Sequence, residues 1–369
     1  MAREWFELAE ASNILTPALL VYPDHVKNNI DRMIQTAGDP ARLRTHVKTH
    51  KTIELVKLQL DKGISKFKCS TIAEAEMIAI AGGKDILLAY QPVGPNIGRF
   101  IDLQKHFTQA KFATIADNLD IIDQLSTAAH KREVIIHVYL DINVGMDRTG
   151  IQNTEMAIKC VQAITSAANL TFAGLHVYDG HIHDARLEDR QKHCDADFAI
   201  VTEIQAGLSE IGLELPNIIA GGTPTFPIHA AHPDRELSPG TPVLWDIGYQ
   251  EAFEDLNFDY AALIATRVIS QPGEHLYCLD LGSKSLASEM PQPRIQFFNL
   301  SEYEIISQSE EHLTIRLPMD ETLQIGDIVY GSPTHICPSV ALYEYMYVIE
   351  NHTVINTWKI LARSRKLTF

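Results

Sequence analysis

Short apolar runs alternate with amphipathic segments between residues 43 and 246. The runs are rich in β-branched residues and resemble strands, whereas apolar residues recur every three or four positions between them, as in helices. Strands that alternate with helices form a parallel sheet, and eight such units over about 200 residues have the size of a (β/α)8 barrel. The eight predicted strands are Leu43–Lys48, Lys66–Ser70, Asp85–Tyr90, Lys111–Ala116, Val134–Ile142, Thr171–Tyr178, Asn217–Thr223 and Pro242–Asp246.

The segment Thr71–Gly83 shows how such a helix is bounded. Thr71 and Glu74 have the spacing of a capping box, in which the threonine hydroxyl accepts a hydrogen bond from a backbone N–H at the helix start. Gly82 and Gly83 suit the left-handed residue that commonly ends a helix. We therefore predict a helix between the second and third strands.

A different pattern begins after Tyr260, where strand-like segments are separated by turns with little helix between them. These segments are Ala262–Gln271, His275–Ser283, His312–Pro318, Asp327–Pro333, Tyr343–His352 and Val354–Arg365. The 369 residues exceed what a single core usually holds. We therefore predict an α/β chain with a barrel at 17–259 and a second, mostly β domain formed by 1–16 and 260–369.

The charge and the cysteines restrict the partners and the compartment. A net charge of −16 without a cluster of Lys and Arg argues against a nucleic-acid partner, which requires a basic face. No apolar run approaches the ~20 residues that span a bilayer, and the N-terminal residues lack the features of a signal peptide. Five cysteines without a CxxC pair indicate reduced thiols. We expect a cytoplasmic protein that binds neither nucleic acid nor membranes.

Polar residues stand at the ends of several predicted strands, and the carboxyl ends of barrel strands form the active-site face. Lys48 and Tyr178 each close a strand, and Asp141–Arg148 follows another. A lysine at this position is placed to form a Schiff base with a phosphorylated aldehyde; the alternative is a solvated surface lysine. Lys51 lies past the strand end, and we expect it to be a surface residue.

Two glycine-containing turns are candidate phosphate sites. Gly222 and Thr223 follow an apolar strand, where glycine lets backbone N–H groups approach an anion and Thr223 adds a hydroxyl. Gly240 and Thr241 lie at the next predicted strand and could supply further donors. The alternative is two tight turns, because glycine loops are common without a ligand.

Two histidine-containing motifs are candidate metal or acid–base sites. His335 and Cys337 are two positions apart, so on extended chain they point to the same side. Imidazole with thiolate suits zinc in an open catalytic site, and the alternative is ordinary packing. His181 and His183 share this spacing, and either could be an acid–base, a stray ligand or a hydrogen-bonded loop histidine. We take His181 as the candidate catalytic histidine.

Seven motifs along the chain resemble, in this order, those of the D-serine dehydratase / D-threonine aldolase family. Its members are pyridoxal-phosphate enzymes with the alanine-racemase-like fold. The segment "RTHVKTHK" resembles the family signature R-P-H-x-K-x-H-K, and "HICPSVAL" resembles H-x-C-P-x-x-N-L. The motifs are Leu15–Tyr22, Arg44–Lys51, Asp141–Gly150, His176–His183, Ser238–Thr241, His335–Leu342 and Trp358–Arg365.

The resemblance implies a cofactor, a metal and an oligomer. It implies that Lys48 carries pyridoxal 5'-phosphate covalently, with Tyr178 and Arg148 against the ring and the two glycine turns at the phosphate. It implies zinc, or another divalent metal, at His335 and Cys337. It also implies a homodimer in which the β-rich domain of one chain helps to close the site of the other.

The reaction that the resemblance implies is dehydration of a β-hydroxy D-amino acid such as D-serine. Lys48 takes the Cα proton, zinc stabilises the departing hydroxyl oxygen, and the products are a 2-oxo acid and ammonia. The same site could instead cleave Cα–Cβ, as D-threonine aldolases do. Within the resemblance, aldolases tend to show H-x-D with a harder ion and dehydratases H-x-C with zinc, so Cys337 favours dehydration.

Other functions stay open at this point. Racemisation needs a second base, and none is identified in the sequence. A cofactor-binding homeostasis protein resembles a bare barrel, which the β-rich segment argues against, and a metal-dependent barrel hydrolase could use the histidines. Thr45, Ala341 and Ser364 depart from the family pattern, which usually has proline, asparagine and glycine there. Because of these departures, the resemblance does not assign a subfamily or a substrate to the chain.

Overall fold

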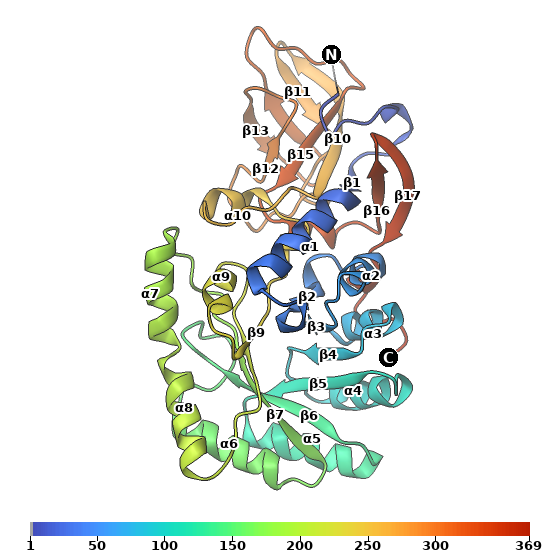
Figure 1. The fold of residues 1–369 in the computed structure, drawn as a ribbon. Coiled ribbons are helices and arrows are strands. Elements are labelled where there is room, and N and C mark those ends of the chain that lie inside the picture. Colours follow the sequence, from blue (N-terminus) through green and yellow to red (C-terminus); the bar gives the residue numbers. More distant parts are fainter. Residues whose placement is uncertain (1–2) are drawn as a thin grey trace. The chain divides into compact units, whose positions relative to one another are not determined.

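The computed structural model describes residues 3–369 and divides the chain into two compact units (Figure 1). The barrel unit comprises Asp31–Lys48, Ile53–Gly240 and Ser364–Phe369. The β unit comprises the chain up to Ile30, Thr49–Thr52 and Thr241–Arg363. The predicted domain limits of 17–259, and of 1–16 with 260–369, stay a prediction. In the described part of the chain, no helix is long and apolar enough to span a bilayer.

Within the described residues, the barrel unit contains eight parallel strands that pair in chain order. They are β2 (Arg44–His46), β3 (Lys66–Cys69), β4 (Asp85–Leu88), β5 (Lys111–Ala116), β6 (Ile136–Ile142), β7 (Leu170–Val177), β8 (Ile218–Ala220) and β9 (Arg235–Leu237). An isolated parallel bridge between Leu43 and Leu237 joins the first and last strands and nearly closes the barrel. The predicted (β/α)8 barrel with a second, mostly β domain is confirmed.

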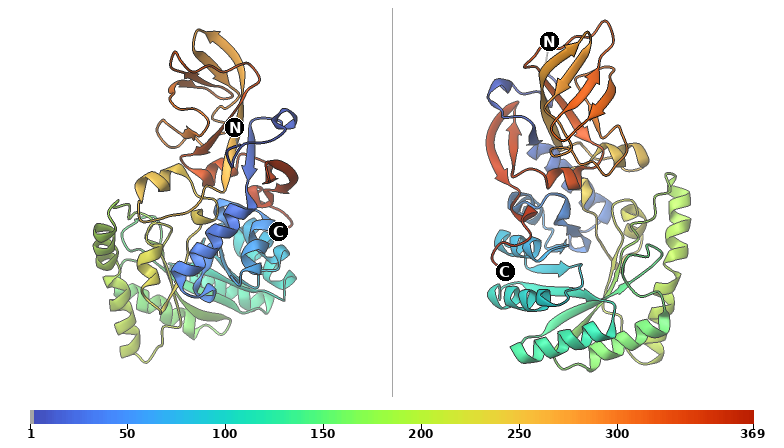
Figure 2. Two further views of the ribbon diagram at one scale, coloured as in Figure 1. Left: turned by 45° about the horizontal axis from the view of Figure 1, so that its top comes forward. Right: turned by 180° about the vertical axis from the view of Figure 1, so that it is seen from behind.

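Helices follow the barrel strands along the chain and lie outside them (Figure 2). They are α2 (Ile53–Asp61), α3 (Ile72–Ala81), α4 (Pro95–His106), α5 (Leu119–Arg132), α6 (Thr154–Ser166), α7 (Leu187–Asp197), α8 (Ala199–Glu210) and α9 (Phe226–Ala230). The helix α1 (Pro23–Ala37) precedes the first barrel strand in the sequence.

The cap predicted for α3 is present. Thr71 Oγ1 accepts a hydrogen bond from Glu74 N at 3.1 Å, and Gly82 ends the helix with φ 99°. The Glu74 carboxylate accepts a hydrogen bond from Ser70 N at 2.6 Å. Both ends of the helix are therefore stabilised by residues that the sequence identifies.

Thr71→Ala is expected to lower the free energy of unfolding by about 1 kcal/mol, because the Glu74 N–H loses its acceptor. Urea unfolding measures the change. Thr127→Ala, at an exposed position within α5, is the matched control and is expected to be neutral or slightly stabilising. An equal loss in both variants would contradict the capping role.

The eighth barrel strand differs from the prediction. It is Arg235–Leu237, whereas the predicted strand Pro242–Asp246 begins in a 3-10 helix at Thr241–Val243. Pro242 has no N–H for a strand ladder, and Leu244 N and Trp245 N donate to Thr241 O instead. The prediction was therefore wrong for this strand, because the apolar run "PVLW" builds a turn.

A buried arginine links three barrel strands. Arg44, 1% exposed, donates to Asp85 on β4 at 2.7 Å and to Glu236 on β9 at 2.6 Å. A buried cation between two carboxylates needs both partners, since an unpaired buried charge is strongly destabilising. The pairs therefore fix β2 to β4 and β9 at the ends of the strands away from Lys48.

Within the described residues, the β unit is built on one sheet of nine strands. They are β1 (Ala18–Val21), β10 (Ala262–Gly273), β11 (Leu276–Leu279), β12 (Ile295–Phe297), β13 (Glu304–Gln308), β14 (Leu313–Arg316), β15 (Ile328–Pro333), β16 (Tyr345–Glu350) and β17 (Thr353–Lys359). The short helices are α10 (Ile247–Ala252) and α11 (Ile336–Val340). All six segments predicted after Tyr260 contain strands, and β12 and β13 were not predicted.

The first strand of the chain lies inside the sheet of the β unit. β1 pairs antiparallel with β10 and parallel with β16. Its side chains are buried, and Leu20 packs in a core cluster with Phe6, Tyr330 and Ile349. The N-terminal segment is therefore an integral part of this core.

Candidate active site

A cavity of about 530 Å³ lies at the carboxyl ends of the barrel strands. Three residues predicted to meet at this face, Lys48, Arg148 and Tyr178, line it together. Lys48 lies on a 3-10 turn, Val47–Thr49, because β2 ends at His46 and not at Lys48 as predicted. The polar residues that line the cavity include His46, Lys48, Lys68, Arg148, His176 and Tyr178.

The ring of Tyr178 is the centre of a group of cations. Lys48 Nζ lies 5.6 Å from the ring centroid, Lys68 Nζ 5.5 Å and Arg148 Cζ 4.9 Å. Cations at this distance are attracted by the face of the ring. The concentration of positive charge makes the cavity suited to an anionic ligand.

Lys68 was missed by the sequence analysis. Lys68 lies on β3 beside His46 of β2, and only 3% of its surface is exposed. Burial, followed by the charge of Lys48, lowers the pKa of Lys68 to about 7. The signal in the sequence is the segment "KFKCS", where a lysine occupies a position inside an apolar barrel strand.

His176 also lines the cavity and was not singled out from the sequence. Its Nδ1 lies 2.6 Å from Asp141 Oδ1, and both side chains are buried. Burial lowers the pKa of His176, so the neutral ring donates through Nδ1–H to the carboxylate. The other nitrogen, Nε2, is then an acceptor, and it has no hydrogen-bond partner among residues 3–369. A buried polar atom of this kind is normally satisfied by a ligand or by water.

The two predicted phosphate turns meet inside the barrel unit. Gly240 N donates to Thr223 Oγ1 at 3.4 Å. A Cβ at Gly222 would lie 3.0 Å from Tyr178 Cε2, so this turn packs directly against the tyrosine ring. The remaining member of the prediction, Thr241, belongs to the β unit, where its Oγ1 lies 3.6 Å from Cys337 Sγ.

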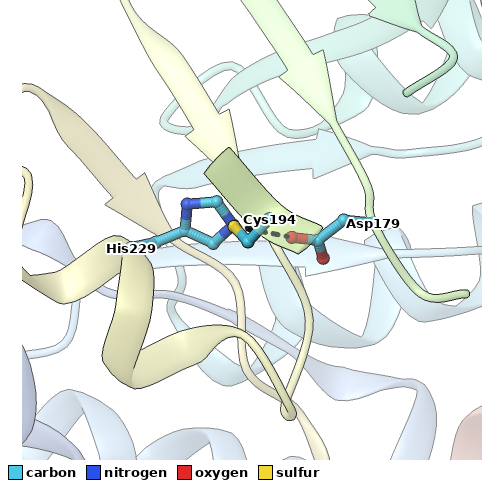
Figure 3. Close-up of side chains that lie close together, drawn as sticks. All are labelled: Asp179, Cys194 and His229. Atoms are coloured by element: carbon cyan, nitrogen blue, oxygen red, sulfur yellow. Dashed lines mark hydrogen bonds and ion pairs between the residues drawn. The ribbon is translucent and has the colours of Figure 1, made fainter. Parts of the chain in front are cut away.

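A buried network orients the first of these turns (Figure 3). His229 Nε2 lies 2.7 Å from Asp179 Oδ2, and Thr225 Oγ1 donates to Asp179 Oδ1 at 2.8 Å. Thr225 in turn accepts from Gly222 N at 3.3 Å. The strand end that carries Tyr178 and the glycine turn are therefore held by one carboxylate, that of Asp179.

The same network contains a group of metal-ligand types, Asp179, Cys194 and His229. Arg235 Nη1 lies 2.8 Å from His229 Nδ1 and can only donate, so that nitrogen accepts. The proton of the neutral ring is then on Nε2, which donates to Asp179. Both nitrogens of His229 are occupied by protein groups, and the cluster is better explained as a hydrogen-bond network than as a metal site.

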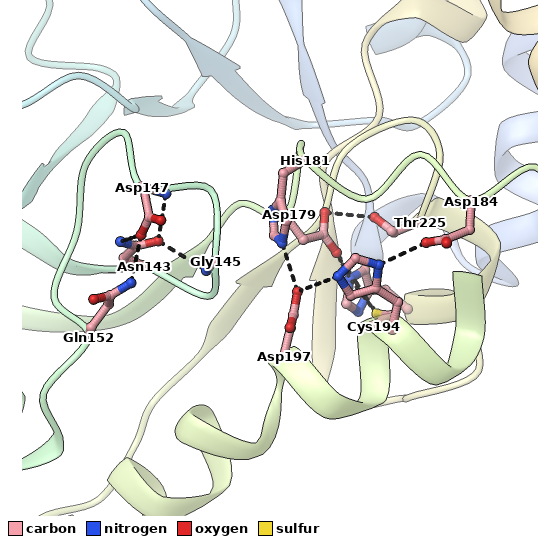
Figure 4. A network of polar contacts seen from close by, with 12 residues as sticks. Asn143, Gly145, Asp147, Gln152, Asp179, His181, Asp184, Cys194, Asp197 and Thr225 are labelled. Atoms are coloured by element: carbon pink, nitrogen blue, oxygen red, sulfur yellow. Dashed lines mark hydrogen bonds and ion pairs between the residues drawn. The ribbon is translucent and has the colours of Figure 1, made fainter. Parts of the chain in front are cut away.

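His181 lies outside the residues that line the cavity. Its Nε2 contacts Asp197 Oδ2 at 2.7 Å (Figure 4). His183 of the same motif is exposed. The catalytic role of His181 stays a prediction.

The pair His335 and Cys337 lies in the β unit at the start of α11. His335 precedes the helix and Cys337 lies within it, so the extended-chain reason for their proximity was wrong. They nevertheless interact: burial opposes protonation of His335, but the hydrogen bond and charge of Cys337 raise its pKa to about 9. His335 Nδ1 also lies 2.7 Å from Glu289 Oε1. The hydroxyl of Thr49 is 3.1 Å from Cys337 Sγ.

Comparisons with known proteins agree on a family and a fold. A model described as alanine racemase, N-terminal domain, matches residues 21–243, and one described as putative serine dehydratase domain matches residues 261–349. A 3-hydroxy-D-aspartate aldolase of Paracoccus denitrificans (strain Pd 1222) is 28% identical over 96% of this chain and 94% of its own. A D-serine dehydratase of Dictyostelium discoideum is 25% identical over 95% of this chain and 97% of its own length. The crystal structure of a D-threonine aldolase from Filomicrobium marinum has a TM-score of 0.88, 25% identity and 96% coverage of both chains.

Proposed function

The chain belongs to the alanine racemase N-terminal domain family, and from this premise we propose that it is a pyridoxal 5'-phosphate- and zinc-dependent lyase. Its proposed reaction is the dehydration of a β-hydroxy D-amino acid such as D-serine to a 2-oxo acid and ammonia. The observation that carries the proposal is the cavity in which the Lys48 amine, Arg148 and Tyr178 meet. The second matched domain and the D-serine dehydratase relative support the same chemistry.

The residues of the cavity fit the proposed cofactor. Its aldehyde needs an amine, which Lys48 would supply, and its flat ring needs an apolar or aromatic wall, which Tyr178 would supply beside Arg148. His176 Nε2, which has no hydrogen-bond partner in the described part of the chain, supports a polar ligand in this cavity. The turns with Gly222, Thr223, Gly240 and Thr241 would hold the phosphate.

When bound, this cofactor supplies an electron sink for the bonds at Cα of the substrate. The chain's own residues would then orient the substrate and move protons. The Lys48 amine would take the Cα proton as general base. Tyr178 would fix the plane of the ring from one side, and Arg148 and Lys68 would offer positive charge to a substrate carboxylate.

The pair His335 and Cys337 fits a zinc ion with open positions. Imidazole and thiolate are ligands that zinc prefers over harder ions, and a bound ion supplies a Lewis acid for a departing hydroxyl. Thr49, whose hydroxyl lies 3.1 Å from Cys337 Sγ, is the residue after Lys48 in the sequence. Cys337 is the feature that favours dehydration over cleavage of Cα–Cβ.

An aldolase is the second candidate function. The names of the Paracoccus denitrificans relative and of the Filomicrobium marinum structure support it, because both proteins are aldolases. Both reactions act on the same class of substrate and differ in the bond that breaks. Lys68 adds a second amine to the cavity, so racemisation is also to be scored as an outcome.

The deciding experiment is a panel of D-serine, D-threonine and 3-hydroxyaspartate incubated with the cofactor-loaded enzyme and zinc. We expect a 2-oxo acid with ammonia from at least one of them. If the products are glycine and an aldehyde, the reaction is aldol cleavage and not dehydration. If the product is the L-enantiomer of the substrate, the reaction is racemisation. No product from any member would reject the proposed lyase.

Removal of zinc is expected to abolish turnover. Dialysis against EDTA should reduce the rate to background, and added Zn²⁺ should restore it. Cys337→Ala should weaken zinc binding by at least about 100-fold, since even partners outside the ligand set are worth 10–100-fold. Cys278→Ala, a half-buried thiol elsewhere in the β unit, is the matched control. Full activity after exhaustive chelation would exclude a catalytic metal.

The homodimer and the cytoplasmic location are also part of the proposal. Sedimentation of the purified chain tests the first. A monomer with full activity would contradict the proposal that a partner subunit helps to close the active site.

A further inference from the structure

We propose that His181, His193 and Asp197 form a second site for a divalent cation such as Zn²⁺ or Co²⁺, beside the loop that carries Arg148. Figure 4 shows His181 and Asp197 pointing toward each other. The site is distinct from the pair His335 and Cys337, which lies in the β unit. It does not depend on the proposed lyase reaction.

The three side chains offer ligand atoms that all lie within 4.8 Å of one another. His193 and Asp197 are four residues apart on α7, so they share one face of the helix. His181 comes from the turn after β7. One carboxylate oxygen, Asp197 Oδ2, lies 2.7 Å from His181 Nε2 and 3.5 Å from His193 Nε2. Two imidazoles and one carboxylate form a set that divalent transition metals bind with open positions left for water.

A neighbouring carboxylate prepares His193 for this role. Asp184 Oδ2 lies 2.8 Å from His193 Nδ1, and because an ionised carboxylate can only accept, this nitrogen carries a proton. In the neutral form of the ring, Nε2 presents its lone pair toward Asp197 Oδ2, which is itself an acceptor. A cation between the two would remove this mismatch. A ligand histidine whose other nitrogen donates to a carboxylate is the usual arrangement around zinc.

The cluster is accessible, in contrast to the buried group at His229. The side chain of His193 is 40% exposed, and those of His181 and Asp197 are 21% and 20% exposed. An ion can therefore enter from solvent and still be held by three protein atoms. The protein groups around His229 already occupy both of its nitrogens.

The position of the site gives it a consequence. Gly145 lies against His181, since a Cβ there would be 2.7 Å from His181 Nε2. Gly145 belongs to the loop between β6 and α6, and Asn143 Oδ1 accepts from Gly145 N and Asp147 N at 3.0 and 3.1 Å, which folds this loop on itself. Arg148 follows in the same loop and lines the cavity. An ion at His181 would therefore brace the loop that places Arg148.

The test is Co²⁺ titration of a chain that also carries His335→Ala and Cys337→Ala, so that the first predicted site is removed. Calorimetry and the visible absorption of bound Co²⁺ should show one ion per chain. Adding His193→Ala or Asp197→Asn should reduce the affinity by at least about 10-fold, the effect expected of a lost partner at a metal site. His183→Ala removes an exposed histidine of the same motif and should leave the affinity unchanged.

A second measurement guards against misfolded variants. Because a cation that binds only the folded chain stabilises it, Zn²⁺ should raise the melting temperature of the background chain and not that of the Asp197→Asn chain. Circular dichroism verifies that both are folded before the metal is added. The proposal fails if the background chain binds no Co²⁺, or if it binds Co²⁺ with the same affinity after His193→Ala and Asp197→Asn.

Discussion

Lys48→Ala is expected to give a colourless chain that retains no cofactor through borohydride reduction and denaturation. The amine of Lys48 is the proposed point of covalent attachment and the proposed base for the Cα proton. A general base alone contributes typically 10²- to 10⁴-fold, so turnover should fall by at least about 1,000-fold when both roles are lost. Mass spectrometry of the reduced peptide and steady-state rates with D-serine measure the two losses separately.

Lys51→Ala is the matched control for this experiment. Lys51 belongs to the same motif, but it lies outside the residues found to line the cavity and is part of the β unit. Its replacement should leave the colour and the reduced cofactor peptide in place. A Lys48→Ala chain that stays yellow through denaturation would transfer the covalent role to another amine, and Lys68 would be the first to examine.

The barrel could be predicted because its signal is local. Strands and helices of a (β/α)8 unit differ in the period of their apolar residues, and each element is read from about ten residues. The capping residues Thr71 and Gly82 flank a single helix and were predicted correctly. The strand predicted at Pro242–Asp246 was wrong because an apolar run of four residues has no period that distinguishes a strand from a turn. The observed strand, Arg235–Leu237, is too polar to stand out in the sequence.

The site could be predicted only in part, for a similar reason. Lys48, Arg148 and Tyr178 stand at or after the ends of strands, where polar residues are conspicuous. Lys68 and His176 lie inside strands, and only the closed barrel shows that their side chains face the cavity. The partner of His176, Asp141, is 35 residues away in sequence. Such pairs depend on the register of neighbouring strands, which the sequence does not display.

His335 and Cys337 were correctly predicted to lie close together, but the reason given for their proximity was wrong. The i, i+2 spacing was attributed to extended chain, but Cys337 lies in a helix and His335 in the residue before it. A sharp turn at a helix start also brings such side chains together. Spacing alone therefore does not identify the backbone that presents two ligands.

Lys68→Met is expected to stabilise the cofactor-free chain by about 4 kcal/mol at pH 7, which follows from a pKa near 7 in the folded chain and 10.5 as its ordinary value. In this pH range the folded chain binds fewer protons at Lys68 than the unfolded chain does. The wild-type stability should therefore rise as the pH increases from about 7 to 10.5. The variant lacks this contribution, so its advantage should shrink over the same window.

The measurement is the melting temperature of both chains, without cofactor, from pH 7 to pH 10. Lys66→Met is the matched control on the same strand: Lys66 pairs with Glu236, so its loss should destabilise the chain. The charges around Lys68 are those of Lys48, Arg148, Asp141 and Asp179, and the first two oppose its protonation. If the Lys68→Met chain melts below the wild type at pH 7, the amine is a cation whose cost of burial is offset by the neighbouring carboxylates. The amine of Lys68 would then stay protonated beside Tyr178 near pH 7, rather than titrate there and exchange a proton with a substrate.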